Sequence, residues 1–268
     1  MKILCPVDFS KHSNLALEYA MHLSNIMDAE LHVIYVYDTP KTAESFVSID
    51  DKIKKSRQED LEELLKKMES IIKTEYPIIS NAYKGNPGTT IPRYADQLEI
   101  DLIVMGTQGN NSLRTILFGS VTRQVASKSG VPVLAIPEEI ANRLTSNKML
   151  LAIDEKLIEH KDVFRVPQML AKKLNIKIDV LHVAKKESND VFDPIVTELL
   201  GNQLGDLNII EGEDPVKEIK KYVESNNIGM LIMVKREKTF FQRLLTVGNT
   251  SEEIAQTNIP LMVIPEKE

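Results

Sequence analysis

Three glycines and a serine in the middle of the chain have the types and spacing of an anion-binding loop. The apolar run 102–105 predicts a strand that leads directly into Gly106 and Gly109. Gly119 and Ser120 then open a segment whose apolar spacing predicts the start of a helix. Glycine permits positive φ and lets backbone N–H groups approach a ligand, and a helix N-terminus offers further donors to an anion. The pattern therefore predicts a phosphate cradle, with a plain tight turn as the alternative.

The rest of the first half alternates apolar strands with amphipathic helices. Apolar spacing predicts helices over 14–27, 53–74 and 91–98, and apolar runs predict strands over 2–7, 31–36, 78–83, 102–105 and 131–136. Near-continuous Val, Ile and Leu in strands separated by helices is typical of a parallel sheet covered on both faces. Ligands of such sheets bind beyond the carboxyl ends of the strands. Asp8, Val36 and Gly106 lie at or near three of these ends, so we expect them to meet at one crevice.

Four strand segments of the first half recur in the same order in the second half. Segments 2–8, 31–36, 101–105 and 131–137 correspond to 148–154, 178–183, 229–234 and 259–265. A repeat of this kind predicts two tandem copies of one domain. The polar stretch 138–147 lacks apolar periodicity and joins them. We therefore predict domains over residues 1–140 and 146–268.

Composition and charge narrow the classes of partner. The chain has 268 residues, 43% of them apolar, and 33 basic against 39 acidic residues give a net charge of −6. Such a surface does not attract nucleic acid or anionic membranes, and no apolar run reaches membrane-spanning length. The single cysteine, Cys5, lies in an apolar strand, where we expect a buried thiol in a reducing compartment. The prediction is a cytoplasmic protein that binds neither nucleic acid nor membrane.

Three segments carry a resemblance to the universal stress protein family. They are the opening 6–10, the strand end at Tyr35 and Val36, and the glycine loop 105–109 with its continuation 119–121. The resemblance implies two tandem open parallel five-stranded sheets in the order 3-2-1-4-5, with helices on both faces. This is an α/β, adenine-nucleotide-binding Rossmann-like fold.

The resemblance also implies a nucleotide site in the first half, with ATP or ADP as the ligand and Mg²⁺ as its companion ion. Asp8 and Val36 would hold the adenine and ribose. The phosphates would be met by Gly109, Gly119, Ser120 and Val121, and the nucleotide would be lined by Pro6, Met105 and Gly106. No catalytic residue and no protein-held metal set is implied.

The second half departs from the family's glycine pattern. Aligned on Gly248, the two earlier glycine positions fall on Lys235 and Lys238, and Asn249 replaces the serine. Two lysines could still attract an anion, but cations alone do not rebuild a nest of N–H groups. We interpret the second half as non-binding or altered in binding.

Two classes of function compete for the first half. One is a regulatory module of the stress response that binds ATP or ADP and changes its choice of protein partner. The other is an enzyme, a slow ATPase or another adenine-nucleotide enzyme of the same fold group. An enzyme needs a base or nucleophile beside the γ-phosphate, whereas the sequence offers only Asp8, at the adenine end. The binding module is therefore favoured, and a scaffold without ligand stays open if the glycines are purely structural.

The last strand of each half suggests how the copies associate. Segments 131–136 and 259–264 are apolar, and in the order 3-2-1-4-5 each is an edge strand. An exposed apolar edge is an aggregation liability that proteins normally cover. We therefore expect the copies to pair as an intramolecular pseudo-dimer, with a homodimer of the whole chain as a further option.

Overall fold

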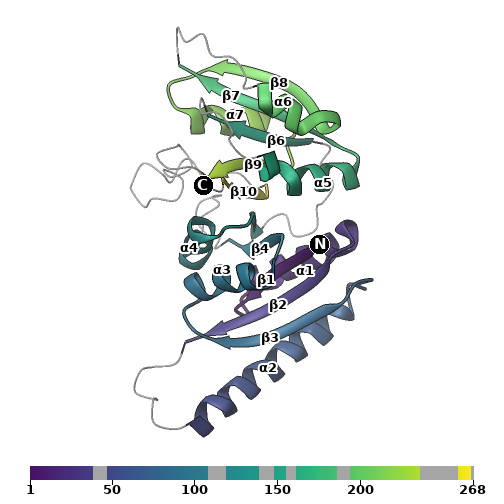
Figure 1. Cartoon of the computed structure of the whole chain (residues 1–268), viewed down its shortest axis with the longest axis vertical. Helices are drawn as coiled ribbons and strands as arrows, with labels where there is room; N and C mark the ends of the chain where they lie inside the picture. The colour runs from purple at the N-terminus through teal and green to yellow at the C-terminus, as the bar shows by residue number, and fades with distance from the viewer. Residues whose placement is uncertain are drawn as a thin grey trace. The chain divides into compact units, whose positions relative to one another are not determined.

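The computed structural model describes residues 1–38, 47–107, 119–138, 148–154, 161–185, 194–235 and 259–266 (Figure 1). They form two compact units. The first comprises Met1–Thr107 and Gly119–Ile136, and the second takes in the described residues from Pro137 onward. The domain limits at residues 140 and 146 stay a prediction, because 139–147 lie outside the described residues.

The first unit is a parallel sheet built from alternating strands and helices. Its elements are β1 (Lys2–Val7), α1 (Lys11–Met27), β2 (Glu30–Tyr37), α2 (Val47–Glu69), β3 (Ile78–Lys84), α3 (Pro87–Gln97), β4 (Leu102–Gly106), α4 (Ser120–Lys128) and β5 (Val133–Ile136). The strands lie in the order β3-β2-β1-β4-β5, and every neighbouring pair is parallel. The predicted strand order 3-2-1-4-5 is confirmed.

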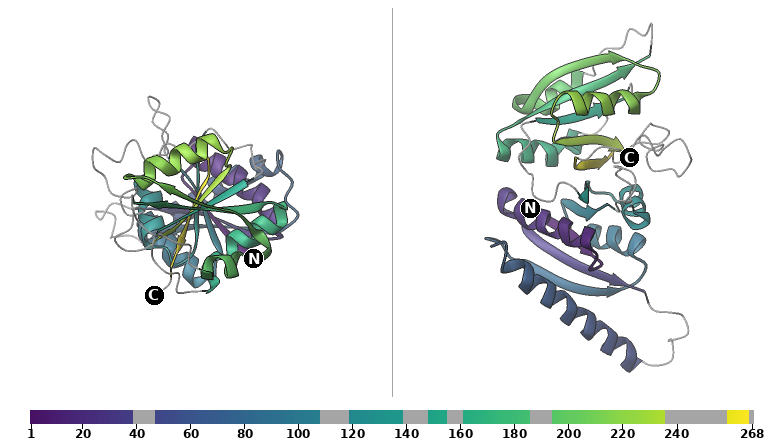
Figure 2. Two further views of the ribbon diagram at one scale, coloured as in Figure 1. Left: turned by 90° about the horizontal axis from the view of Figure 1, so that it is seen from above. Right: turned by 180° about the vertical axis from the view of Figure 1, so that it is seen from behind.

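The second unit repeats this order. Its elements are β6 (Lys148–Ile153), η3 (Lys161–Phe164), α5 (Arg165–Leu174), β7 (Lys177–Ala184), α6 (Pro194–Leu200), η4 (Gly201–Gln203), β8 (Leu204–Glu211), α7 (Pro215–Ser225), β9 (Met230–Lys235) and β10 (Leu261–Pro265). The strands lie in the order β8-β7-β6-β9-β10, again parallel. Each unit is thus an open α/β sheet with helices on both faces (Figure 2).

Strand alternation divides the first unit's core into two layers. One layer packs α3 and α4 onto the sheet through a buried cluster that includes Leu4, Ile34 and Ile103. The other face is covered by α1, which packs against β1, β2 and β4, and by α2, which packs against β2 and β3. Residues at alternate strand positions therefore face different helix pairs.

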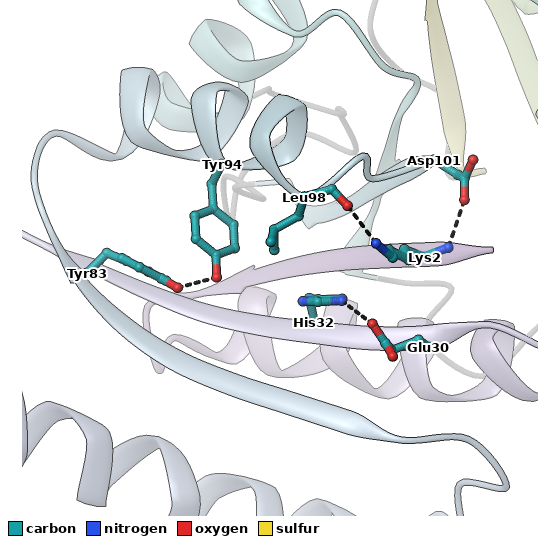
Figure 3. A network of polar contacts seen from close by, with 7 residues as sticks. All are labelled: Lys2, Glu30, His32, Tyr83, Tyr94, Leu98 and Asp101. Carbon is teal, nitrogen blue, oxygen red and sulfur yellow. Dashed lines mark hydrogen bonds and ion pairs between the residues drawn. The ribbon is translucent and has the colours of Figure 1, made fainter.

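Polar contacts join α3 to β3 and join β1 to the start of β4 (Figure 3). The hydroxyl groups of Tyr83 on β3 and Tyr94 on α3 are hydrogen-bonded, so α3 is fixed against the edge strand. At the amino end of β1, the backbone N–H of Lys2 donates to the Asp101 carboxylate at 2.8 Å, which ties β1 to the start of β4. The Tyr83–Tyr94 pair lies at the carboxyl end of β3, where Tyr83 is paired with Val36 of β2.

One side chain occupies the open edge of β3. Gln58 on α2 accepts a hydrogen bond from the Ala82 N–H at 3.0 Å and donates to the Ser80 carbonyl at 3.3 Å. These two backbone groups therefore face away from β2, and they are the groups that a further parallel strand would use. Unpaired edges invite pairing with other chains, so the Gln58 amide blocks that route for part of β3.

The corresponding strand of the second unit is less well covered. The helix before β8, α6, has 7 residues, whereas α2 has 23. Leu207 and Ile209, two positions apart on β8, are 41% and 42% exposed. Among the described residues, the two units thus differ in how a helix covers the outermost strand, β3 or β8.

Replacing Gln58 by alanine tests its role at the edge. We expect the free energy of unfolding to fall by about 1–2 kcal/mol, since a partly buried set of hydrogen bonds is lost. We also expect concentration-dependent association in light scattering, because the β3 edge becomes accessible. Gln97→Ala, at an exposed position on α3, is the matched control. Equal behaviour of the two variants would contradict the role of Gln58.

Candidate functional site

The carboxyl ends of β1, β2 and β4 present three buried residues on one face of the first sheet. Val36 and Met105 belong to the cluster beneath α3 and α4. Pro6 is also buried and lies on the same face of β1 as Leu4, two positions away. Asp8, two residues further, is exposed at the end of this face. The structure thus brings Pro6, Asp8, Val36 and Met105 to one face and one end of the sheet.

The N-terminus of α4 lies over this end of the sheet. Gly119 is its N-cap, with φ −53°, and as a glycine it has no side chain with which to cap the first turn. Thr122, which is 4% exposed, donates its hydroxyl to the Gly106 carbonyl at 2.9 Å and so anchors the helix start to the end of β4. The first turn of a helix directs backbone N–H groups and the positive end of the helix dipole toward an anion.

The sequence did not single out Thr122, which fixes the start of α4 to the end of β4. The sequence did contain a signal for this residue. Thr122 lies three and four positions before the buried Val125 and Ala126, so all three share the inward face of α4. The side chain of Val121 packs against the core beneath α4. Only the backbone of Val121 could therefore contact a ligand. Ser120 is exposed. Gly109 lies outside the described residues.

Gly106 is required by packing, independently of any ligand. A Cβ built there would lie 2.4 Å from the backbone oxygen of His12 and 2.7 Å from its carbonyl carbon. Neither Gly106 nor Gly119 has a positive φ. The expectation that these glycines are needed for a left-handed backbone conformation is therefore wrong. The reason for glycine at 106 is the close approach of the first turn of α1 to the end of β4.

Asp8 is held by hydrogen bonds from the residues that follow it. Its Oδ1 accepts from the Ser10 N–H at 3.0 Å. Partial burial acts to raise the pKa of Asp8, but hydrogen bonds from Ser10 and Ser13 and from the backbone outweigh it, so that the pKa is lowered. At neutral pH Asp8 is an ionised acceptor.

The strand register corrects the alignment of the second half. β1 pairs Ile3 with Leu102, and β6 pairs Met149 with Met230. Counting along β4 and β9 from these pairs, the counterpart of Gly106 is Val234, not Lys235. The pairs with the last strand agree, since Gly106 lies opposite Ile136 and Val234 lies opposite Ile264.

The second unit has a buried valine at this position. In the first unit α1 starts at Lys11, whereas the first helical residue described after β6 is Lys161, in η3. Val234 is 8% exposed, so its side chain fills space at the end of β9. Lys235 is the last residue of β9, and burial lowers its pKa. Lys238, Gly248 and Asn249 lie outside the described residues.

Other candidate chemistry is limited. Cys5 is fully buried, and burial raises the pKa of its thiol far above the usual range, so it is an unreactive core residue as expected. Within the described ranges, no three His, Cys, Asp or Glu side chains gather as a metal site. None of the described helices has the length and apolarity needed to cross a membrane.

Comparisons with known proteins agree on one family. Residues 1–137 match the model of the Universal stress protein family. The chain is 34% identical over 140 residues to Universal stress protein MJ0531 of Methanocaldococcus jannaschii, covering 50% of this chain and 81% of that protein. Universal stress protein MJ0577 of the same organism is 27% identical over 154 residues, covering 50% and 93%.

A solved structure extends the likeness in fold to the second unit. The crystal structure of a universal stress protein from Archaeoglobus fulgidus superposes with a TM-score of 0.77 and covers 99% of this chain and 98% of that one. The identity is 20%, so this likeness concerns the fold.

A change at Gly106 tests the packing at the end of β4. We expect Gly106→Ala to lower the free energy of unfolding by about 1–3 kcal/mol, because the new methyl group must displace the backbone of α1. Gly130→Ala is the control, since a Cβ there would lie 3.4 Å from its nearest neighbour. Chemical denaturation of both variants provides the comparison, and equal stabilities would contradict this assignment.

The pH dependence of stability tests the environment of Asp8. A pKa lowered by folding adds stability above the unfolded value, near roughly pH 4, and this stability is lost as the pH falls through the folded value. We therefore expect Asp8→Asn to be less stable than the native protein at pH 7, with the difference shrinking toward pH 3. Urea unfolding across this range measures it. A difference that does not change with pH would contradict the prediction.

Proposed function

The chain belongs to the universal stress protein family, and from this premise we propose that its first unit binds one ATP or ADP as a regulatory module of the stress response. The observation that carries the proposal is the N-terminus of α4, which has a glycine as its N-cap and lies over the end of the sheet where Asp8 and Val36 share a face. A donor-rich helix start and an ionised acceptor beside an apolar floor suit the two ends of a nucleotide.

The phosphate end of the proposed site is made of backbone. In this proposal the N–H groups of Ser120 and Val121 meet the phosphates, with Gly119 leaving room for their approach. Gly109 belongs to the same cradle by the family's spacing. Thr122 takes part indirectly, since its bond to the Gly106 carbonyl holds the helix start in place.

The adenosine end combines one charge with an apolar surface. The Asp8 carboxylate can accept hydrogen bonds from a ribose hydroxyl or from the adenine amino group. Pro6, Val36 and Met105 supply apolar atoms against which the nucleotide can pack, as in most small-molecule sites. Gly106 contributes its carbonyl and its lack of a side chain.

Mg²⁺ enters the proposal as a companion of the nucleotide. Mg²⁺ is commonly held by substrate phosphates and water with one or two protein ligands. The described residues offer no cluster of three metal-ligating side chains, so phosphate oxygens and water would supply most of the ligands of the ion. We therefore expect Mg²⁺ to strengthen the binding of ATP.

The second unit is proposed to be non-binding or altered in binding. Val234 stands at the position of Gly106 and has a buried side chain, and the half-buried Lys235 follows it. The loop and helix start that would form its cradle lie outside the described residues. The proposal is thus one nucleotide per chain.

The runner-up is a slow ATPase or another adenine-nucleotide enzyme of the same fold group. Catalysis of phosphoryl transfer needs a group that positions the attacking nucleophile. The first turn of α4 contains no acidic residue, and Asp8 belongs to the adenosine end of the proposed site. Release of phosphate over many turnovers would favour the enzyme, and its absence with intact binding would favour the module.

Location and partners belong to the same proposal. A cytoplasmic location rests on the sequence and on Cys5 as a buried free thiol. The protein partner that responds to the nucleotide is unidentified. The intramolecular pseudo-dimer and the homodimer of the chain stay predictions from the sequence.

Titration calorimetry of the full chain with ATP and Mg²⁺ tests the proposal. We expect one site per chain. Gly109→Val should abolish binding while the far-ultraviolet circular dichroism stays native, because a side chain would occupy the place of a phosphate. Gly130→Val, in a loop of the first unit with room for a Cβ, is the control. Two equivalent sites, or native affinity in folded Gly109→Val, would contradict the prediction.

A further inference from the structure

The residue after Asp8 has an unusual backbone conformation. Phe9 has φ 62°, in the left-handed region. A bulky residue at positive φ is a genuine outlier, and such strain persists only where the surroundings over-determine it. Phe9 lies between Asp8, the proposed adenosine ligand, and Ser10, the N-cap of α1. The strain is therefore located where β1 is redirected into α1.

Hydrogen bonds on one side of Phe9 close a small ring around it. The Asp8 N–H donates to Ser13 Oγ at 3.2 Å, and Ser13 Oγ donates to the Ser10 carbonyl at 3.1 Å. The Ser10 N–H in turn donates to Asp8 Oδ1 at 3.0 Å. Asp8 is thus bound through both its backbone and its carboxylate. Ser13 is 7% exposed, so little water competes for its hydroxyl.

An aromatic contact holds Phe9 from the other face of the sheet. The Phe9 and Tyr35 rings have their centroids 4.8 Å apart. Tyr35 precedes Val36 on β2, so its side chain lies on the face opposite to Val36. The left-handed turn therefore places Phe9 against the face of α1 and α2 and leaves Asp8 on the face of the proposed site.

Helix capping alone does not explain this arrangement. Ser10 already accepts a hydrogen bond from the Ser13 N–H at 3.2 Å, which is the ordinary N-cap interaction. The hydroxyl of Ser13 instead reaches back beyond the helix to the backbone of Asp8. A side chain that only supported α1 would not need that contact.

We propose that Ser13 and Phe9 are positioning residues that fix the direction of the Asp8 carboxylate toward the adenosine end of a bound nucleotide. This inference rests on the proposed function. Ser13 acts by holding the Asp8 backbone, and Phe9 acts by its left-handed turn and its contact with Tyr35. Neither residue needs to touch the nucleotide.

The first test compares two serines of the same helix. Ser13→Ala should weaken ATP binding about tenfold, as expected for a residue coupled to its neighbour. Ser24→Ala is the control, because Ser24 is also buried in α1 and donates its hydroxyl to the Met21 carbonyl at 2.8 Å. In the double variant with Asp8→Asn, Ser13→Ala should add almost nothing further. Additive losses, or equal affinities for Ser13→Ala and Ser24→Ala, would overturn the proposal.

A second series separates the turn of Phe9 from its ring. Phe9→Gly can adopt positive φ without strain, and Phe9→Asn tolerates it, whereas Phe9→Val is disfavoured there. We expect ATP affinity to fall in the order native, Asn and Gly, then Val, with the last loss about tenfold or more. Thermal unfolding of each variant shows that it is folded at the temperature of the titration. Equal affinities across the series would refute the role of the turn.

A third measurement works without any nucleotide. NMR titration of the Asp8 carboxyl carbon in the ligand-free chain should give a higher pKa in Ser13→Ala than in the native protein, and no change in Ser24→Ala. Failure of the native chain to bind ATP would overturn the proposed function, and this titration would still decide whether Ser13 controls Asp8. An unchanged Asp8 pKa in folded Ser13→Ala would overturn the positioning role.

Discussion

The close approach of two helices to the last residue of β4 is the constraint on which the site depends. On one face the His12 carbonyl of α1 occupies the space that a Cβ at Gly106 would need. On the other face Thr122 of α4 bonds the Gly106 carbonyl. A single residue without a side chain therefore sets the position of both helix starts. Because the first turn of α1 carries Ser13 and the first turn of α4 carries Ser120, both ends of the proposed nucleotide site depend on this contact.

The second unit carries a different residue at this position. Val234 stands in the place of Gly106, and its side chain is buried. A valine at the end of β9 requires that no backbone approach it as closely as His12 approaches Gly106. The fold survives the exchange, since the strand order of the two units is the same. The difference at this position therefore leaves the order of the strands unchanged.

The sequence predicted the strands, the repeat and the strand order well, because apolar runs and family spacing carry that information directly. Helix limits were less accurate. The third helix was predicted from residue 91 but begins at Pro87, since proline suits a first turn without adding to an apolar pattern. Counting from glycine to glycine placed Lys235 at the position of Gly106, whereas strand pairing gives Val234. Contacts between distant segments have no local signature in the sequence. An example is the hydrogen bond between Gln58 on α2 and Ala82 on β3.

The glycines of the motif therefore carry unequal information about function. Gly106 is demanded by the packing of α1, and a chain that bound no ligand would need it as much as one that does. Gly119 has an ordinary φ and no side chain with which to cap α4, so packing does not account for it as it does for Gly106. The distinction between a tight turn and a phosphate cradle thus rests on Gly109, Gly119 and Ser120. The same reasoning applies at Asp8, where the left-handed turn at Phe9 places the Phe9 ring beside Tyr35. One short segment thus serves both the packing and the proposed site.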